Sequence, residues 1–107
     1  MAKTLTKLQA EGLQRMLTDA AEMAVMQSRA HGCAWFYQGK AKALFNAAEH
    51  VRVMHACGRG TEHFIAGIVE RSGAQVIPCD EFNDGRAEGY AVALETVRRY
   101  FAMLANS

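Results

Sequence analysis

Aromatic and basic side chains lie close together in sequence between residues 29 and 60, and they are the residues of this chain best suited to binding chemistry. Five basic residues and one acidic residue fall in this segment. Proteins that bind single-stranded nucleic acids use such a combination, because bases stack on aromatic rings and phosphates attract cations. One hypothesis is therefore a nucleic-acid-binding surface in the segment 29–59, formed by Trp35, Tyr37, Lys40, Lys42, Arg52 and Arg59. The opposing interpretation places the rings in the core and the lysines in solvent.

The segment that follows is acidic. Residues 61–95 hold seven acidic and two basic residues. Such charge polarity can steer a charged partner or pair two copies of a chain. Arginines on a protein partner could contact the acidic residues before and within the last predicted helix, which are Asp80, Glu81, Asp84 and Glu88. Asp84 is alternatively the N-cap of that helix.

Four histidines and three cysteines raise the question of a metal protein or a small enzyme. Structural zinc sites combine C-x₂₋₄-C with H-x₃₋₅-H, and only His50 and His55 match half of that pattern. No pattern for an activated nucleophile is present. We therefore expect no catalytic residue, no metal and no cofactor. A third hypothesis is a metal site or small enzyme built on His31, Cys33, His55, Cys57 and His63.

The composition predicts one globular domain over residues 1–107. Half of the residues are hydrophobic and 21% are charged, which excludes a disordered chain. No apolar run approaches the ~20 residues of a membrane-spanning helix, and the first residues lack a signal peptide. The odd number of cysteines, three, fits reduced thiols. We expect a cytoplasmic protein outside the membrane.

The elements that position these side chains are predicted to be helices. Apolar residues recur every three or four positions over residues 85–106, with charged residues, Arg86 among them, on the opposite side. Thr6 and Gln9 form a capping-box pattern at the start of a helix over residues 5–30. Shorter helices are predicted over residues 40–57 and 61–72, separated by a glycine turn at residues 58–60. The fold class is therefore all-α, a four-helix domain with long terminal helices.

Two segments leave alternatives open. Residues 33–37 are either a short strand or the first turn of the next helix. Residues 74–79 are predicted to be extended, since Pro78 confines them to an edge or a loop. Together, residues 33–37 and 75–79 could form one short strand pair. Residues 80–85 are predicted to be an acidic loop.

The first predicted helix is unusually long. At ~1.5 Å per residue it would extend roughly 39 Å, beyond what a compact domain of this size covers. It therefore either bends near Gly12 or packs against a second copy or another protein. Met16, Met23 and Met26 could supply an adaptable apolar contact. We expect a homodimer.

Residues 86–97 contain the pattern G-Y-x-x-A-L-x-x-V, which begins at Gly89. This segment resembles helices in small accessory proteins of phages and mobile elements. The resemblance covers these residues alone and carries over no functional residue. It implies a protein that binds and blocks a host machine. We therefore expect a non-enzymatic helical regulator or inhibitor that binds a protein partner, with nucleic-acid binding as the alternative.

Overall fold

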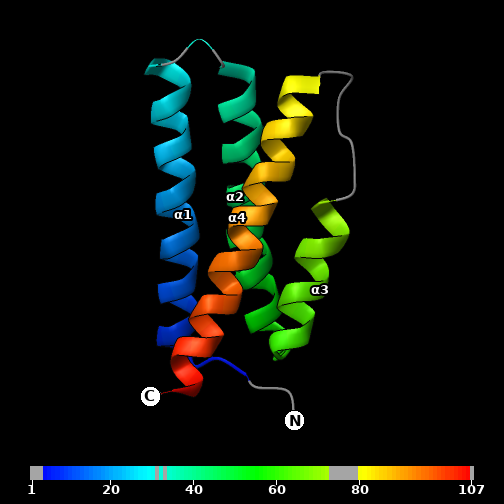
Figure 1. The fold of residues 1–107 in the computed structure, drawn as a ribbon. Coiled ribbons are helices and arrows are strands. Elements are labelled where there is room, and N and C mark those ends of the chain that lie inside the picture. Colours follow the sequence, from blue (N-terminus) through cyan, green and yellow to red (C-terminus); the bar gives the residue numbers. More distant parts are fainter. Residues whose placement is uncertain (1–3, 31, 33, 73–79, 107) are drawn as a thin grey trace.

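Three long helices run side by side, and a shorter helix packs against two of them (Figure 1). The computed structural model describes residues 4–30, 32, 34–72 and 80–106. The helices are α1 (Lys7–Ala30), α2 (Ala34–Ala56), α3 (Thr61–Ser72) and α4 (Asp80–Ala105). Helices α2 and α4 each contact all of the other helices, and α2 has the most extensive contacts. The predicted all-α, four-helix fold is confirmed.

Local signals set the ends of α1 and α2. The Thr6 amide donates to Oε1 of Gln9 at 3.0 Å, and the Gln9 amide donates to Oγ1 of Thr6 at 3.1 Å. These reciprocal bonds form the predicted capping box. Helix α2 ends at Ala56, and two residues later Gly58 has a φ of 69°, in the left-handed region. The Arg59 amide then donates back to the carbonyl of Met54 at 3.0 Å, as in a Schellman turn.

Two predicted segments differ from the structure. Residues 34–37 are the first turn of α2, so the strand alternative for residues 33–37 is wrong over this part. Residues 75–79, the other half of the predicted strand pair, lie outside the described residues. Residues 80–85 are helical rather than an acidic loop, and Asp84 is therefore not an N-cap. Acidic side chains in the first turn of α4, Asp80 and Glu81, favour this earlier start because they face the positive end of the helix dipole.

The length of α1 needs no second copy to accommodate it. The molecule measures 43 × 24 × 22 Å, and α2 and α4 have 23 and 26 residues against 24 in α1. The expectation that α1 must bend or overhang is wrong, because the bundle is elongated along its helices. None of the helices in the described part of the chain is both long enough and apolar enough to cross a bilayer.

Helices α2 and α4 touch through their backbones. A Cβ atom added at Gly85 would lie under 3.0 Å from the carbonyl of Phe36, and one at Gly39 would overlap the carbonyl of Phe82. At Gly89 an added Cβ would be 2.5 Å from the carbonyl oxygen of Lys40. Because no side chain fits at these positions, the glycines fix how closely the two helices approach.

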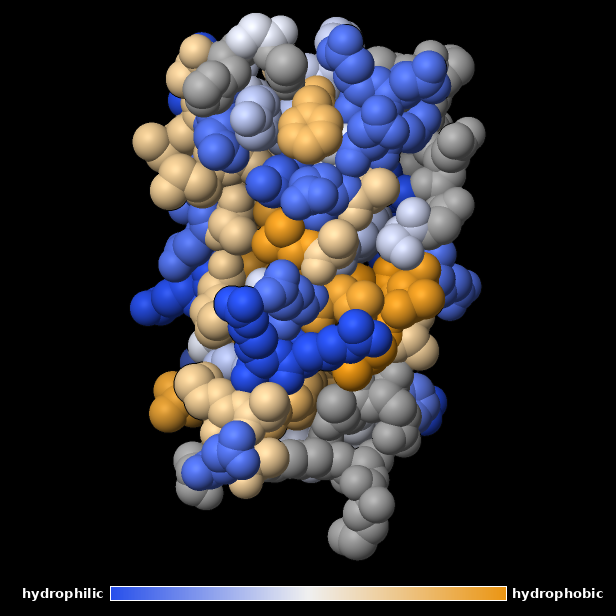
Figure 2. Space-filling model, in the orientation of Figure 1, coloured by the Kyte–Doolittle hydropathy of each residue, from blue (hydrophilic) through white to orange (hydrophobic). Residues whose placement is uncertain are grey.

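The inner face of α4 is rotated from the predicted one. Arg86, assigned to the outer face, is 6% exposed, and its guanidinium lies 4.8 Å from the centre of the Tyr90 ring. Ala93 is fully buried, whereas Leu94 is half-buried and lines a hollow between α3 and α4. Hydrophobic atoms gather on the surface where these two helices meet (Figure 2). The rotation follows from the glycines, because the face that carries Gly85 must meet α2.

A buried histidine joins α3 to α2. His50 is 5% exposed, and its Nε2 lies 3.1 Å from the carbonyl oxygen of His63. Its Nδ1 lies 3.1 Å from Nη1 of Arg71. An arginine can only donate, so Nδ1 accepts and the proton resides on Nε2, which donates to His63. Burial is the main cause that lowers the pKa of His50, and the nearby charge of Arg71 lowers it further.

Aromatic rings complete the core at this end. The Phe64 ring of α3 packs edge-to-face on Phe101 of α4, with 5.7 Å between ring centres. The Tyr100 hydroxyl donates to the carbonyl of Gln9 at 2.8 Å and ties α4 to the first turn of α1. All four helices therefore contribute to a single core.

Gly89→Ala tests the close approach of α2 and α4. Alanine is the better helix former by about 1 kcal/mol, yet its methyl group would meet the backbone of α2. We expect the free energy of unfolding to fall by about 1–3 kcal/mol, the range for overpacked cores, as measured by urea denaturation. The control Ala91→Gly, at an exposed position of α4, should lose about 1 kcal/mol from helix propensity alone. A Gly89→Ala protein as stable as the native one would contradict the packing.

His50 makes stability depend on pH. Since its pKa is lowered in the folded state, the unfolded chain binds the proton more readily. The contribution of His50 to the free energy of unfolding is fully present above the unfolded-state pKa of 6.5. This contribution is lost as the pH falls through the lower, folded-state pKa. Urea denaturation should give a lower free energy of unfolding at about pH 5.5 than at about pH 7.5.

The control for this pH effect is His50→Gln. Glutamine can still donate to the carbonyl of His63 but does not titrate, so most of the loss between the two pH values should disappear. His55→Gln, on a less buried side of the same helix, should retain the loss. An unchanged pH dependence in His50→Gln would show that other groups cause it.

Candidate protein-binding site

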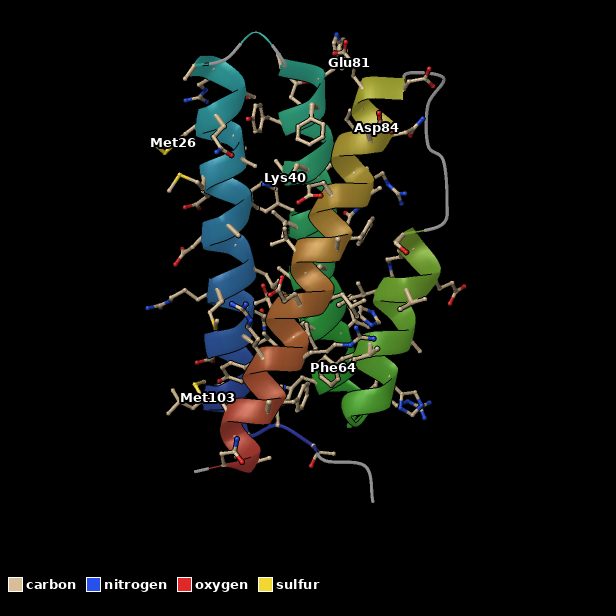
Figure 3. All side chains as sticks on the ribbon, viewed as in Figure 1. Met26, Lys40, Phe64, Glu81, Asp84 and Met103 are labelled. Atoms are coloured by element: carbon tan, nitrogen blue, oxygen red, sulfur yellow. The ribbon has the colours of Figure 1, made fainter. Side chains whose placement is uncertain are left out.

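A hollow of about 410 Å³ lies where α2 and α4 begin. Phe36 and Tyr37 line it from the first turn of α2. Glu81 and Asp84 line it from the first turns of α4. Both carboxylates lie at the end of the bundle where α4 starts (Figure 3). Two rings and two carboxylates therefore share one opening.

The glycine contacts hold these side chains in place. Gly85 lies against the carbonyl of Phe36, so the first turns of the two helices are in direct contact. The rings of Phe36 and Tyr37 are perpendicular, with an interplanar angle of 88° and 5.4 Å between ring centres. Sites on packed helix ends are more rigid than sites on loops. The hollow is thus formed before any ligand arrives.

The hollow is electrostatically suited to a cation. Glu81 and Asp84 are exposed, and neither joins a salt bridge within the described ranges of the chain. The dipole of α4 offsets part of their negative charge. Lys40 lies one turn further along α2 and is half-buried (Figure 3), and the guanidinium of Arg86 faces the Tyr90 ring. A guanidinium group can stack on an aromatic ring while it pairs with a carboxylate.

The structure brings together only half of the predicted acidic set. Glu81 and Asp84 line the hollow, whereas Asp80 and Glu88 are exposed and do not. Phe36 was not predicted as a binding residue, because only Trp35 and Tyr37 of the aromatic run were assigned to a binding surface. In a helix, successive side chains point about 100° apart, so Trp35 is 55% exposed while its two neighbours are half-buried. The i, i+3 spacing of Glu81 and Asp84 was the available signal for a shared face.

The predicted nucleic-acid set is spread along α2. Trp35 and Lys42 lie on its exposed side near one end, and Arg59 follows its other end, roughly 36 Å away at ~1.5 Å per residue. Arg52 donates through Nε to both carboxylate oxygens of Glu49 at 3.0 and 3.1 Å, which neutralises its charge locally. Tyr37 lies beside Glu81 and Asp84, whose charges repel phosphates. These six residues do not form a compact basic patch.

The predicted metal ligands divide into two groups. His31 and Cys33 lie outside the described residues. His55 is half-buried, whereas Cys57 and His63 are exposed. The backbone carbonyl of His63 accepts the hydrogen bond of His50. Within residues 4–30, 32, 34–72 and 80–106, no three His, Cys, Asp or Glu side chains lie close enough together to hold a metal ion.

The residues of the phage-like segment contribute to packing. Gly89 meets the backbone of α2, and the Tyr90 hydroxyl accepts a hydrogen bond from Nδ2 of Asn46 at 3.3 Å. The surfaces left for binding are therefore the hollow and the exposed faces of the helices. No protein-family model, curated protein or solved structure matches this chain.

Proposed function

We propose that this protein is a non-enzymatic binding protein that recognises a basic segment of a protein partner at the hollow between α2 and α4. The observation that carries the proposal is the meeting of two aromatic rings and two carboxylates around one opening. Arginine side chains fit this chemistry best, because a planar guanidinium can stack on a ring and pair with a carboxylate. By occupying such a segment, the protein would act as a regulator or inhibitor of its partner.

A protein partner is favoured over a nucleic acid at this site. Phosphates would meet Glu81 and Asp84 at the rim, and Asp80 and Glu88 add further negative charge on α4. Binding of a basic segment instead gains attraction from all four groups. The phage-type role implied by residues 86–97 is consistent with such a blocking protein and belongs to the same proposal.

A labelled hexa-arginine peptide tests the proposal by fluorescence anisotropy. We expect the native protein to bind it, and Glu81→Lys/Asp84→Lys to weaken binding at least tenfold, since two attractive contacts become repulsive. Labelled hexa-glutamate and a single-stranded oligonucleotide should not bind. Binding of the oligonucleotide in preference to hexa-arginine would support the nucleic-acid alternative instead.

The control separates the hollow from net charge. Glu70→Lys/Glu95→Lys changes the net charge by the same amount at exposed positions outside the hollow. This variant should bind hexa-arginine within about threefold of the native protein, the effect of screened long-range charge alone. Equal losses in the two double variants would show that the peptide responds to overall charge and would overturn the proposed site.

A further inference from the structure

The outward side of α1 carries a row of exposed apolar side chains. Leu8, Met16, Met23 and Met26 are 79%, 44%, 56% and 62% exposed. At ~100° per residue they fall within roughly a quarter of the helix circumference, opposite the buried side of α1. Met26 points away from the bundle (Figure 3), and pale orange and blue side chains alternate along the edge over α1 (Figure 2). We call these four residues the outer methionine stripe.

Charged residues beside the stripe alternate in sign along α1. Glu11, Arg15, Glu22 and Arg29 are all exposed and lie along one side of it. An antiparallel second copy presents the same four charges in reverse order. In the register that sets Arg15 of each copy level with Glu22 of the other, Arg29 lies about 4.5 Å, less than one turn, along the helix from the point level with Glu11. In a parallel pair the row would lie on opposite sides of the contact in the two copies and would not meet itself. The charged row is therefore complementary to itself in one orientation only.

The apolar side chains agree with this register. The midpoint between Met16 and Met23 along α1 nearly coincides with the midpoint between Arg15 and Glu22. Met16 of one copy therefore lies nearly level with Met23 of the other. A hollow of about 280 Å³ lies at the N-terminal half of α1, lined by Leu8, Glu11, Gly12 and Arg15. In the same register it lies level with Met26 of the second copy. An unbranched thioether side chain can adapt to fill an irregular hollow of this kind.

We propose that two copies of this protein associate through antiparallel packing of their α1 helices along the outer methionine stripe. The contact is isologous, since each patch meets itself across a twofold axis near residues 18–20. The contact does not involve the hollow between α2 and α4, because no residue of α1 lines that hollow. Such a dimer places the two hollows at opposite ends of the assembly, so it can bind two basic segments at once.

The register also places one unfavourable pair at its centre. Asp19 is exposed and lies between Met16 and Met23 on the stripe, so the two copies bring their Asp19 carboxylates near the axis. Like charges in such a position oppose association. Asp19→Asn should therefore tighten the dimer by about two- to fivefold, the upper range for a single exposed charge contact.

Charge exchange tests the antiparallel register by sedimentation equilibrium. We expect the native protein to dimerise with a dissociation constant between about 10 µM and about 1 mM, because the contact of one helix pair is small. Arg15→Glu places a carboxylate next to Glu22 of the second molecule, and Glu22→Arg places a guanidinium next to Arg15 of the second molecule. Each variant alone should therefore dimerise at least tenfold more weakly. An equimolar mixture of the two variants restores both opposite-charge pairs and should dimerise as tightly as the native protein.

Lys42→Glu is the control, because it changes the net charge as Arg15→Glu does but lies on the exposed side of α2. It should dimerise like the native protein, and circular dichroism should show native helix content in every variant. A native protein that stays monomeric at about 1 mM overturns the proposal. A mixture of Arg15→Glu and Glu22→Arg that stays monomeric, or an Asp19→Asn dimer no tighter than the native one, overturns the antiparallel register.

Discussion

The contact between the backbones of α2 and α4 determines where most other side chains of this protein lie. At Gly39, Gly85 and Gly89 the partner helix occupies the space that a Cβ atom would need. Close approach increases dispersion contact along both helices, and it fixes their rotation because only the glycine faces can meet. The rotation of α4 in turn buries Arg86 against the Tyr90 ring and leaves Leu94 between α3 and α4. One steric constraint therefore sets both the core and the surface of this helix pair.

The short helix α3 is held differently. Its contact with α2 uses a polar group, since His50 bonds to the carbonyl of His63 on one nitrogen and to Arg71 on the other. Gly67 is needed there because an added Cβ would overlap the His50 ring. A buried polar group is stable only while both of its bonds are made, so this arrangement specifies one position of α3. Protonation of His50 would replace an acceptor with a donor opposite Arg71, so acid is expected to weaken the contact between α3 and α2.

The two proposed contact surfaces use different physical interactions and do not overlap. The hollow between α2 and α4 combines carboxylates with aromatic rings and suits a cation from another protein. The outer methionine stripe on α1 is apolar, and its flanking charges match those of a second copy in reverse order. Neither surface needs the protein to change conformation, because both lie on helices that the core already fixes. A small chain of this kind can be both a dimer and a binder of two partner segments.

The sequence by itself determined the features that depend on one helix at a time. Thr6 and Gln9 start α1, Gly58 ends α2, and the three- and four-residue spacing of apolar side chains marks the helices, because these are local backbone and periodicity effects. The order of charges along α1 is also a property of that helix alone. Only the tertiary structure decided which side of α4 faces inward, that residues 80–85 are helical, and that Phe36 and Tyr37 lie beside Glu81 and Asp84. These outcomes depend on the distance and rotation between two helices, which steric exclusion between distant glycines and carbonyl groups sets, and no pattern within a single segment encodes that distance.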